Sequence, residues 1–97
     1  MPVRASVARF ALLGPLPDEH ADESVIARHQ AALHAIEQPV SADEAAVLVT
    51  LFGPDGSFGL AWALLHLIES SETLLLVAAP AQTANEWLHR LWERAHR

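Results

Sequence analysis

The chain has 97 residues, of which 52% are hydrophobic, and its formal net charge is −6. This length and composition exclude an intrinsically disordered chain and allow one core, so we expect a single domain over residues 1–97. The sequence contains no cysteine, which excludes disulfides and thiol chemistry and fits a reducing compartment.

Acidic residues are concentrated in the middle of the chain. Between Phe10 and Glu86 the only arginine is Arg28, whereas the other arginines lie near the two ends. Such a body repels phosphate backbones and attracts cationic surfaces, so we expect a basic protein partner and no direct nucleic-acid binding. The alternative interpretation is that these acids are ordinary solvated residues at helix N-termini.

Residues 1–16 form an N-terminal arm whose structure the pattern leaves open. The spacing of Val3, Val7 and Phe10 suits a helix, whereas residues 7–13 also suit a short strand. The apolar run in this arm is shorter than the roughly 7 to 15 residues that a secretory signal needs. We therefore expect a cytoplasmic protein.

An amphipathic helix is predicted over residues 18–38, with Asp18 as its cap. Its apolar stripe is spaced at helical intervals and consists of Val25, Ile26, His29, Leu33 and Ile36. A histidine on such a stripe is usually a hydrogen-bonded core residue, so we expect His29 to be buried. His20 and His34 are expected to point outward.

The next helix is predicted to begin at Ser41 and to run for about three turns. Ser41 and Glu44 fit the reciprocal capping box, and Val40 is placed to pack on Ala45. Residues 47–52 are rich in strand-forming side chains, but the cap upstream and the short distance to Gly53 favour a helix. A strand is therefore the minority interpretation.

A central helix is predicted over residues 57–69, where almost every position is apolar and no face is left for water. Asp55 or Ser57 is expected to cap its first turn. The run is too short to cross a bilayer, which takes about 20 residues, so we read it as the axis of a small domain. Trp62, His66 and Glu69 form its one polar line, and we expect His66 to pack on Trp62 and to bond Glu69.

The chain after this helix is ambiguous until its last segment. Residues 73–79 suit either a strand or a helix, and residues 8–13 are the expected partner if they form a strand. A last helix is predicted to start at Thr83, which forms a second capping box with Glu86. One side of that helix carries Trp87, Leu88, Leu91, Trp92 and Ala95.

These elements predict an all-α fold, a small single-domain helical bundle packed around the helix at 57–69. The alternative is an α+β fold with a minimal two-stranded sheet. No repeat, linker or low-complexity segment divides the chain.

Catalytic and metal-binding patterns are weak in this sequence. His66 and Glu69 are spaced for one metal, but a di-metal bundle needs matched pairs on two helices. The glycine loop at 53–59 lacks the lysine of a phosphate loop and carries Asp55 instead. We expect no enzyme activity, no cofactor and no metal, and keep a small metalloprotein using His66 and Glu69 as the least favoured hypothesis.

A family resemblance rests on residues 52–69, from Phe52-Gly53-Pro54-Asp55-Gly56-Ser57 through the apolar run to Glu69, and on Asn85-Glu86-Trp87 downstream. These segments resemble short uncharacterised bacterial proteins that look like immunity partners of secreted polymorphic toxins. The resemblance implies a small cytoplasmic antidote that binds a toxin domain and occludes its active site. Because nuclease toxins are basic, an acidic inhibitor would associate with them quickly.

We therefore expect a protein-binding inhibitor that is monomeric when free and forms a 1:1 complex with a cognate toxin or another basic protein, without membrane association. The residues expected to contact that partner are acidic, and they are Asp18, Glu19, Asp22 and Glu23, extended by Asp43, Glu44, Asp55, Glu69 and Glu72. The alternative function is a small homodimeric regulatory or scaffold module.

Overall fold

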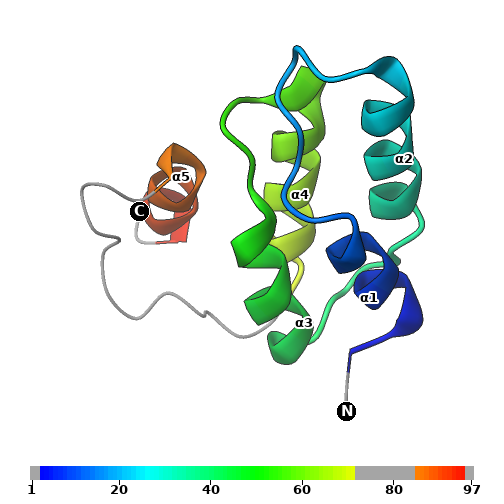
Figure 1. Cartoon of the computed structure of the whole chain (residues 1–97). Helices are drawn as coiled ribbons and strands as arrows, with labels where there is room; N and C mark the ends of the chain where they lie inside the picture. Colours follow the sequence, from blue (N-terminus) through cyan, green and yellow to red (C-terminus); the bar gives the residue numbers. More distant parts are fainter. Residues whose placement is uncertain (1–2, 72–84, 96–97) are drawn as a thin grey trace.

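The computed structural model describes residues 3–71 and 85–95, which form helices and turns without a strand (Figure 1). The all-α prediction is confirmed for this part of the chain, whereas residues 73–79 lie outside it. No helix in the described ranges is long and apolar enough to cross a membrane. The elements in chain order are α1 (Ala5–Leu12), α2 (Glu23–His34), α3 (Ala42–Leu48), the 3₁₀ turns η1 (Val49–Leu51) and η2 (Ser57–Gly59), α4 (Leu60–Glu69) and α5 (Glu86–Ala95).

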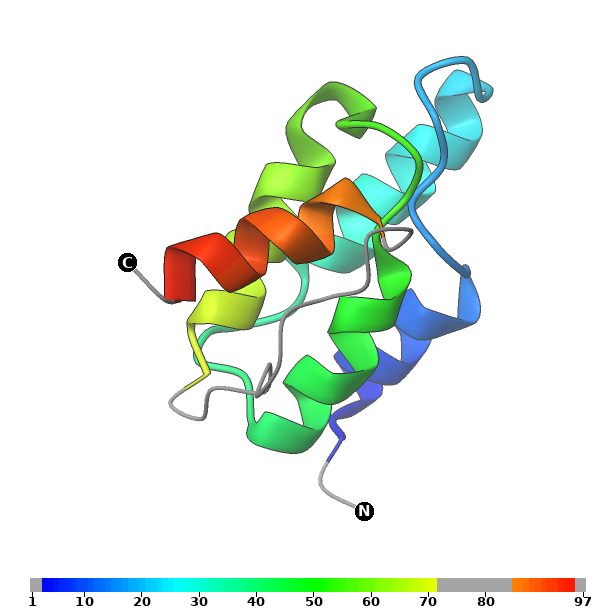
Figure 2. The ribbon, with the colours of Figure 1, turned by 90° about the vertical axis from the view of Figure 1, so that its left-hand side faces the viewer.

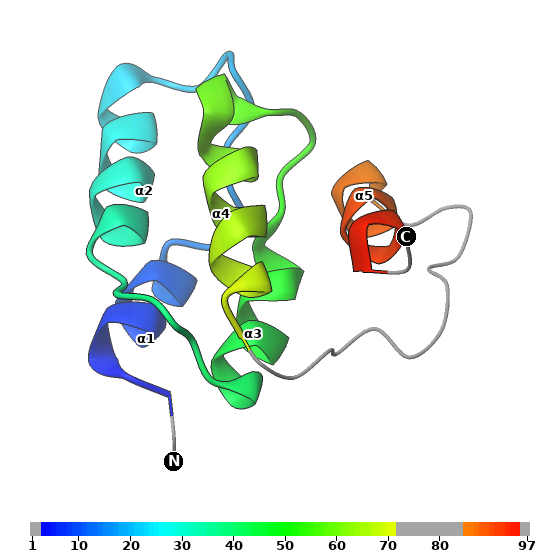
Figure 3. The same cartoon turned by 180° about the vertical axis from the view of Figure 1, so that it is seen from behind.

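Helix α4 is the centre of the bundle, as predicted. It packs against α2, α3 and α5, and Figure 3 shows it between α2 and α3. Burial of a whole leucine side chain contributes about 1.5–3 kcal/mol, so this helix supplies much of the core. Its buried residues are Leu60, Ala61, Leu64, Leu65, Leu67 and Ile68.

Two parts of the prediction for residues 57–69 are wrong. The α-helix begins only at Leu60, because Ser57, Phe58 and Gly59 have positive φ angles of 46°, 53° and 92°. Three left-handed residues in succession are incompatible with a right-handed helix. The segment is also not fully covered, since Phe58 is 69% exposed and Trp62 is 43% exposed.

Helix α1 shows that the N-terminal arm is helical, and helix α2 starts later than predicted. The N-terminal arm is helical over Ala5–Leu12, with Val7 and Phe10 buried. Helix α2 is shorter than predicted because Asp18 is not its cap: the Asp18 carboxylate accepts the His20 amide at 2.9 Å in a turn instead. The helix then starts after Asp22.

Helix α3 agrees with its predicted capping box. The Ser41 hydroxyl accepts the Glu44 amide at 3.1 Å, and the Glu44 carboxylate accepts the Ser41 amide at 2.9 Å. With η1 the helical segment runs to Leu51, close to the predicted three turns. Val40 and Ala45 are both buried at its start.

Helix α5 crosses the side of α4 and α3 (Figure 2). Thr83 lies outside the described residues, so the predicted cap is not seen. Asn85 provides the cap instead, because its side-chain oxygen accepts the Trp87 amide at 2.8 Å. The buried side of the helix carries Trp87 and Leu91, as the apolar spacing predicted.

Candidate functional site

The loop before α2 and the loop before α4 are joined by hydrogen bonds between distant residues. The Glu19 amide donates to Asp55 at 3.1 Å, and the Phe58 amide donates to the Glu19 carboxylate at 3.1 Å. The second oxygen of Asp55 accepts the Ser57 amide at 2.9 Å. Two carboxylates therefore hold three backbone amides and fix the two loops relative to each other.

These hydrogen bonds hold the backbone of Phe58 in an unusual conformation. A non-glycine residue in the left-handed region costs about 1–2 kcal/mol, and such residues are concentrated at functional sites. Here the backbone at Phe58 is left-handed and its ring is 69% exposed. The packing of the ring does not require that arrangement, because the ring is mostly outside the core. The loop is therefore suited to presenting an aromatic side chain to solvent.

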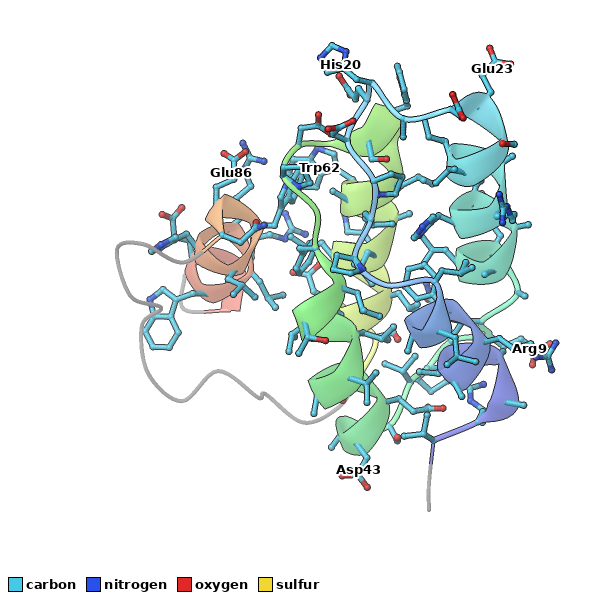
Figure 4. The ribbon with its side chains drawn as sticks, viewed as in Figure 1. Arg9, His20, Glu23, Asp43, Trp62 and Glu86 are labelled. Carbon is cyan, nitrogen blue, oxygen red and sulfur yellow. The ribbon has the colours of Figure 1, made fainter. Side chains whose placement is uncertain are left out.

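A second group of aromatic residues lies beside the loop, where α4 meets α5. The Trp62 and Trp87 rings meet edge to face with centroids 5.0 Å apart, and Phe52 stacks on Trp87 at 6.1 Å. The Arg90 guanidinium lies 4.3 Å from the Trp87 centroid and 5.7 Å from that of Trp62. Figure 4 shows Trp62 on the side of α4 toward α5. Trp62 keeps part of its indole exposed within this cluster.

Close backbone packing fixes the base of the loop. A Cβ on Gly53 would collide with the carbonyl oxygen of Leu16, so only glycine fits there. The Gly53 carbonyl also accepts a hydrogen bond from the Asn85 side chain at 2.7 Å, which ties the loop to the start of α5. Ser57 Oγ and Trp87 Nε1 are buried without a hydrogen-bond partner among the described residues.

Five of the predicted partner-binding acids lie at the end of the molecule where these loops meet. Asp18 and Asp22 flank the turn into α2, and Asp55 is bonded to the same turn. His20 and Glu23 mark this end in Figure 4. We call this area the loop-end surface, and define it as Asp18, Glu19, Asp22, Glu23, Asp55, Phe58 and Trp62.

Asp43 and Glu69 do not belong to that surface. Asp43 lies at the opposite end of the molecule (Figure 4). Glu69 pairs with Arg94 through two bonds of 2.7 and 3.0 Å, in place of the expected bond to His66. His66 does lie beside Trp62, with ring centroids 6.1 Å apart. Glu72 lies outside the described residues.

Glu44 is the clearest correction to the predicted partner-binding set, because its side chain is buried. Its carboxylate accepts bonds from the Arg4 amide and guanidinium at 2.9 to 3.2 Å, as well as from Ser41. The hydrogen bonds from Arg4 lower the pKa of Glu44 from 4.5 to about 2. Glu44 therefore joins the N-terminal arm to α3 and is not available to a partner.

One described cavity, of about 330 Å³, lies between α2 and α4, and its lining includes His34, His66 and Gln38 among apolar side chains. Within residues 3–71 and 85–95, no three histidine or acidic side chains are grouped to hold a metal ion. The hypothesis of a metal at His66 and Glu69 is weakened further because Arg94 engages Glu69.

Comparison with known proteins adds no assignment: no family model, curated protein or solved structure matches the chain. The resemblance to toxin immunity proteins therefore stays a prediction based on residues 52–69 and 85–87.

Sequence reasoning found the acids of the loop-end surface but missed its two aromatic residues. Phe58 was assigned to the core because it belongs to an apolar run, and Trp62 was placed on the one polar line of the helix, as the residue on which His66 packs. A signal was present in the sequence, since Phe58 stands between Gly56-Ser57 and Gly59, and glycines beside an aromatic residue favour a turn.

Proposed function

We propose that this protein is a protein-binding inhibitor of the immunity or antitoxin type. It acts in the bacterial cytoplasm and docks on a basic toxin domain through the loop-end surface. The observation that carries the proposal is Phe58, whose backbone is left-handed and hydrogen-bonded and whose ring is exposed near Glu19 and Asp55. Asp18, Asp22 and Glu23 lie at the same end of the molecule.

Interface energetics support this assignment. Binding energy in protein complexes is concentrated in a few residues, often aromatic, that enter pockets on the partner. Because hydrogen bonds already hold the backbone that carries the ring, less conformational entropy is lost on binding than for a mobile loop. The surrounding acids steer a basic partner toward the surface and raise the association rate. Occlusion of a toxin active site then needs no chemistry from the inhibitor.

A growth assay tests the proposal. The reading frame beside the gene is expected to encode a secreted protein with a variable C-terminal domain, and that domain is expressed alone in a laboratory bacterium. We expect growth arrest, rescue by the wild-type inhibitor and by Asp43→Asn, and loss of rescue with Phe58→Asp. Growth arrest that the wild-type protein does not relieve would contradict the proposal.

The second candidate function is a homodimeric scaffold, and it rests on exposed leucines at the end of α1. Leu12 is 86% exposed and Leu13 is 37% exposed at the end of α1. Adjacent exposed leucines are typical of contacts between subunits. Sedimentation at micromolar concentration separates the two functions. The inhibitor is expected to remain a monomer, whereas a scaffold would form a dimer that Leu12→Glu dissociates.

A further inference from the structure

The exposed aromatic residues and the acids at the loop end constrain the chemistry of the partner. Phe58 and Trp62 both lie at the N-terminal end of α4, and together they leave a large apolar area open to solvent. Glu19 and Asp55 use part of their hydrogen-bonding capacity on backbone amides. A carboxylate has about four acceptor positions, so both retain capacity toward solvent.

The chain itself shows how a cation packs on this aromatic cluster. The Arg90 guanidinium lies over the Trp87 ring and also approaches Trp62, while its other contact is an ion pair with Glu86 at 3.5 Å. Guanidinium groups pack favourably on indole rings, more so when water is excluded. The exposed part of Trp62 offers the same kind of contact to an arginine from another protein.

We infer that the partner presents an apolar pocket that receives the Phe58 ring, bordered by arginine side chains that reach the loop-end carboxylates and pack on Trp62. This inference rests on the proposed function for the kind of complex, and it adds the chemistry that the complex uses. The acids alone would accept any cation, whereas the exposed Phe58 ring also requires an apolar pocket next to the positive charge.

The negative charge of the loop-end surface argues against a second copy of the chain, nucleic acid or anionic lipid as its ligand. In a two-fold dimer formed through the loop end, the same acids would face each other across the interface, which is destabilising. Nucleic acid and anionic lipid carry the same sign of charge as these acids and would be repelled. An arginine-bearing protein surface satisfies both the ring and the carboxylates.

Synthetic peptides of about 12 residues test the inference with the full-length protein. We would titrate the ¹⁵N-labelled chain with an arginine–leucine peptide, an arginine–glycine peptide and a glutamate–leucine peptide, and follow the backbone amides and the Trp62 indole. The arginine–leucine peptide is expected to shift the Glu19 and Phe58 amides and the Trp62 indole. The arginine–glycine peptide should bind about 10-fold more weakly, and the glutamate–leucine peptide should not bind.

Three variants make the test specific. Phe58→Ala is expected to weaken binding of the arginine–leucine peptide about 10-fold, as for an interface hot spot. Asp22→Asn should weaken it about 3-fold at low salt, with the effect lost at high salt, because exposed charges are screened. Asp43→Asn removes one equal charge at the far end and should change nothing. Equal binding by Phe58→Ala and wild type, or shifts centred away from the loop end, would overturn the inference.

Failure of this inference is distinguishable from failure of the proposed function. If the wild-type protein relieves growth arrest but the peptides shift other residues, the inhibitor stands and its assigned surface is wrong. If the peptides map to the loop end but anionic vesicles of phosphatidylglycerol bind there equally well, the protein partner is wrong.

Discussion

Replacement of Glu44 by glutamine removes one charge from the contact that joins the N-terminal arm to α3. The wild-type carboxylate accepts bonds from the Arg4 amide, the Arg4 guanidinium and the Ser41 amide, all donors. In Glu44→Gln one oxygen becomes an NH₂ group, which faces donors and leaves them without an acceptor. Loss of acceptors for buried donors is among the costly effects of single substitutions.

The magnitude follows from the pKa of Glu44. Its carboxyl has a pKa of about 2 in the folded chain against an ordinary value of 4.5. At about 1.4 kcal/mol for each pKa unit, the charged form gains at most about 3.5 kcal/mol. Arg4 is 41% exposed, and solvent weakens its attraction for the carboxylate. We therefore expect Glu44→Gln to lower the free energy of unfolding by about 2 kcal/mol.

Urea unfolding at pH 7 measures this loss, with Asp43→Asn as the matched control. Asp43 is the exposed neighbour on the same helix, and its substitution should change stability by less than about 0.5 kcal/mol. Because folding lowers the Glu44 pKa, its contribution is complete above pH 4.5 and is lost as the pH falls toward 2. The difference between wild type and variant should shrink over that range. Equal midpoints for Glu44→Gln and wild type at pH 7 would refute this reasoning.

Three further predictions concern stability. Burial, aided by the Arg28 charge, lowers the pKa of His29 below 6.5, so acidification below that pH should favour the unfolded chain. Urea titrations between pH 7.5 and 5 should show a loss of stability in wild type and a smaller loss in His29→Leu. Gly53→Ala should destabilise the fold by about 2 kcal/mol or more, measured by thermal unfolding, because its Cβ would collide with the Leu16 carbonyl. Phe58→Gly should raise stability by about 0.5–1 kcal/mol, since it relieves the left-handed backbone, while it abolishes rescue in the growth assay. A variant at Phe58 that loses both stability and rescue would contradict a functional origin of the strain.

Features of the fold that depend on neighbouring residues were predictable from the sequence. The Ser41–Glu44 capping box spans three residues, so its pattern determines its geometry. The helical spacing of His29 and Leu33 identified the buried face of α2, whereas the spacing of Val7 and Phe10 left helix and strand open for the segment that forms α1. Hydrophobic spacing is a reliable signal because one face of each helix must enter the core.

Features that depend on distant residues were not predictable. Nothing local indicates that Arg4 meets Glu44, or that Glu19 bonds the amide of Phe58, because these partners lie 40 and 39 positions apart. For the same reason Glu44 was placed on the partner surface and Phe58 in the core. The candidate site combines acids visible in the sequence with an aromatic residue whose exposure only the assembled loops determine.

Hydrogen–deuterium exchange of the protein, alone and in complex with the toxin domain that we propose as its partner, locates the contact surface without any substitution. We expect complex formation to slow exchange of the amides at residues 17–22 and 55–62, with little change at α1 and around Asp43. Protection confined to the end of α1, at Leu12 and Leu13, would contradict the assignment of the loop end as the docking surface.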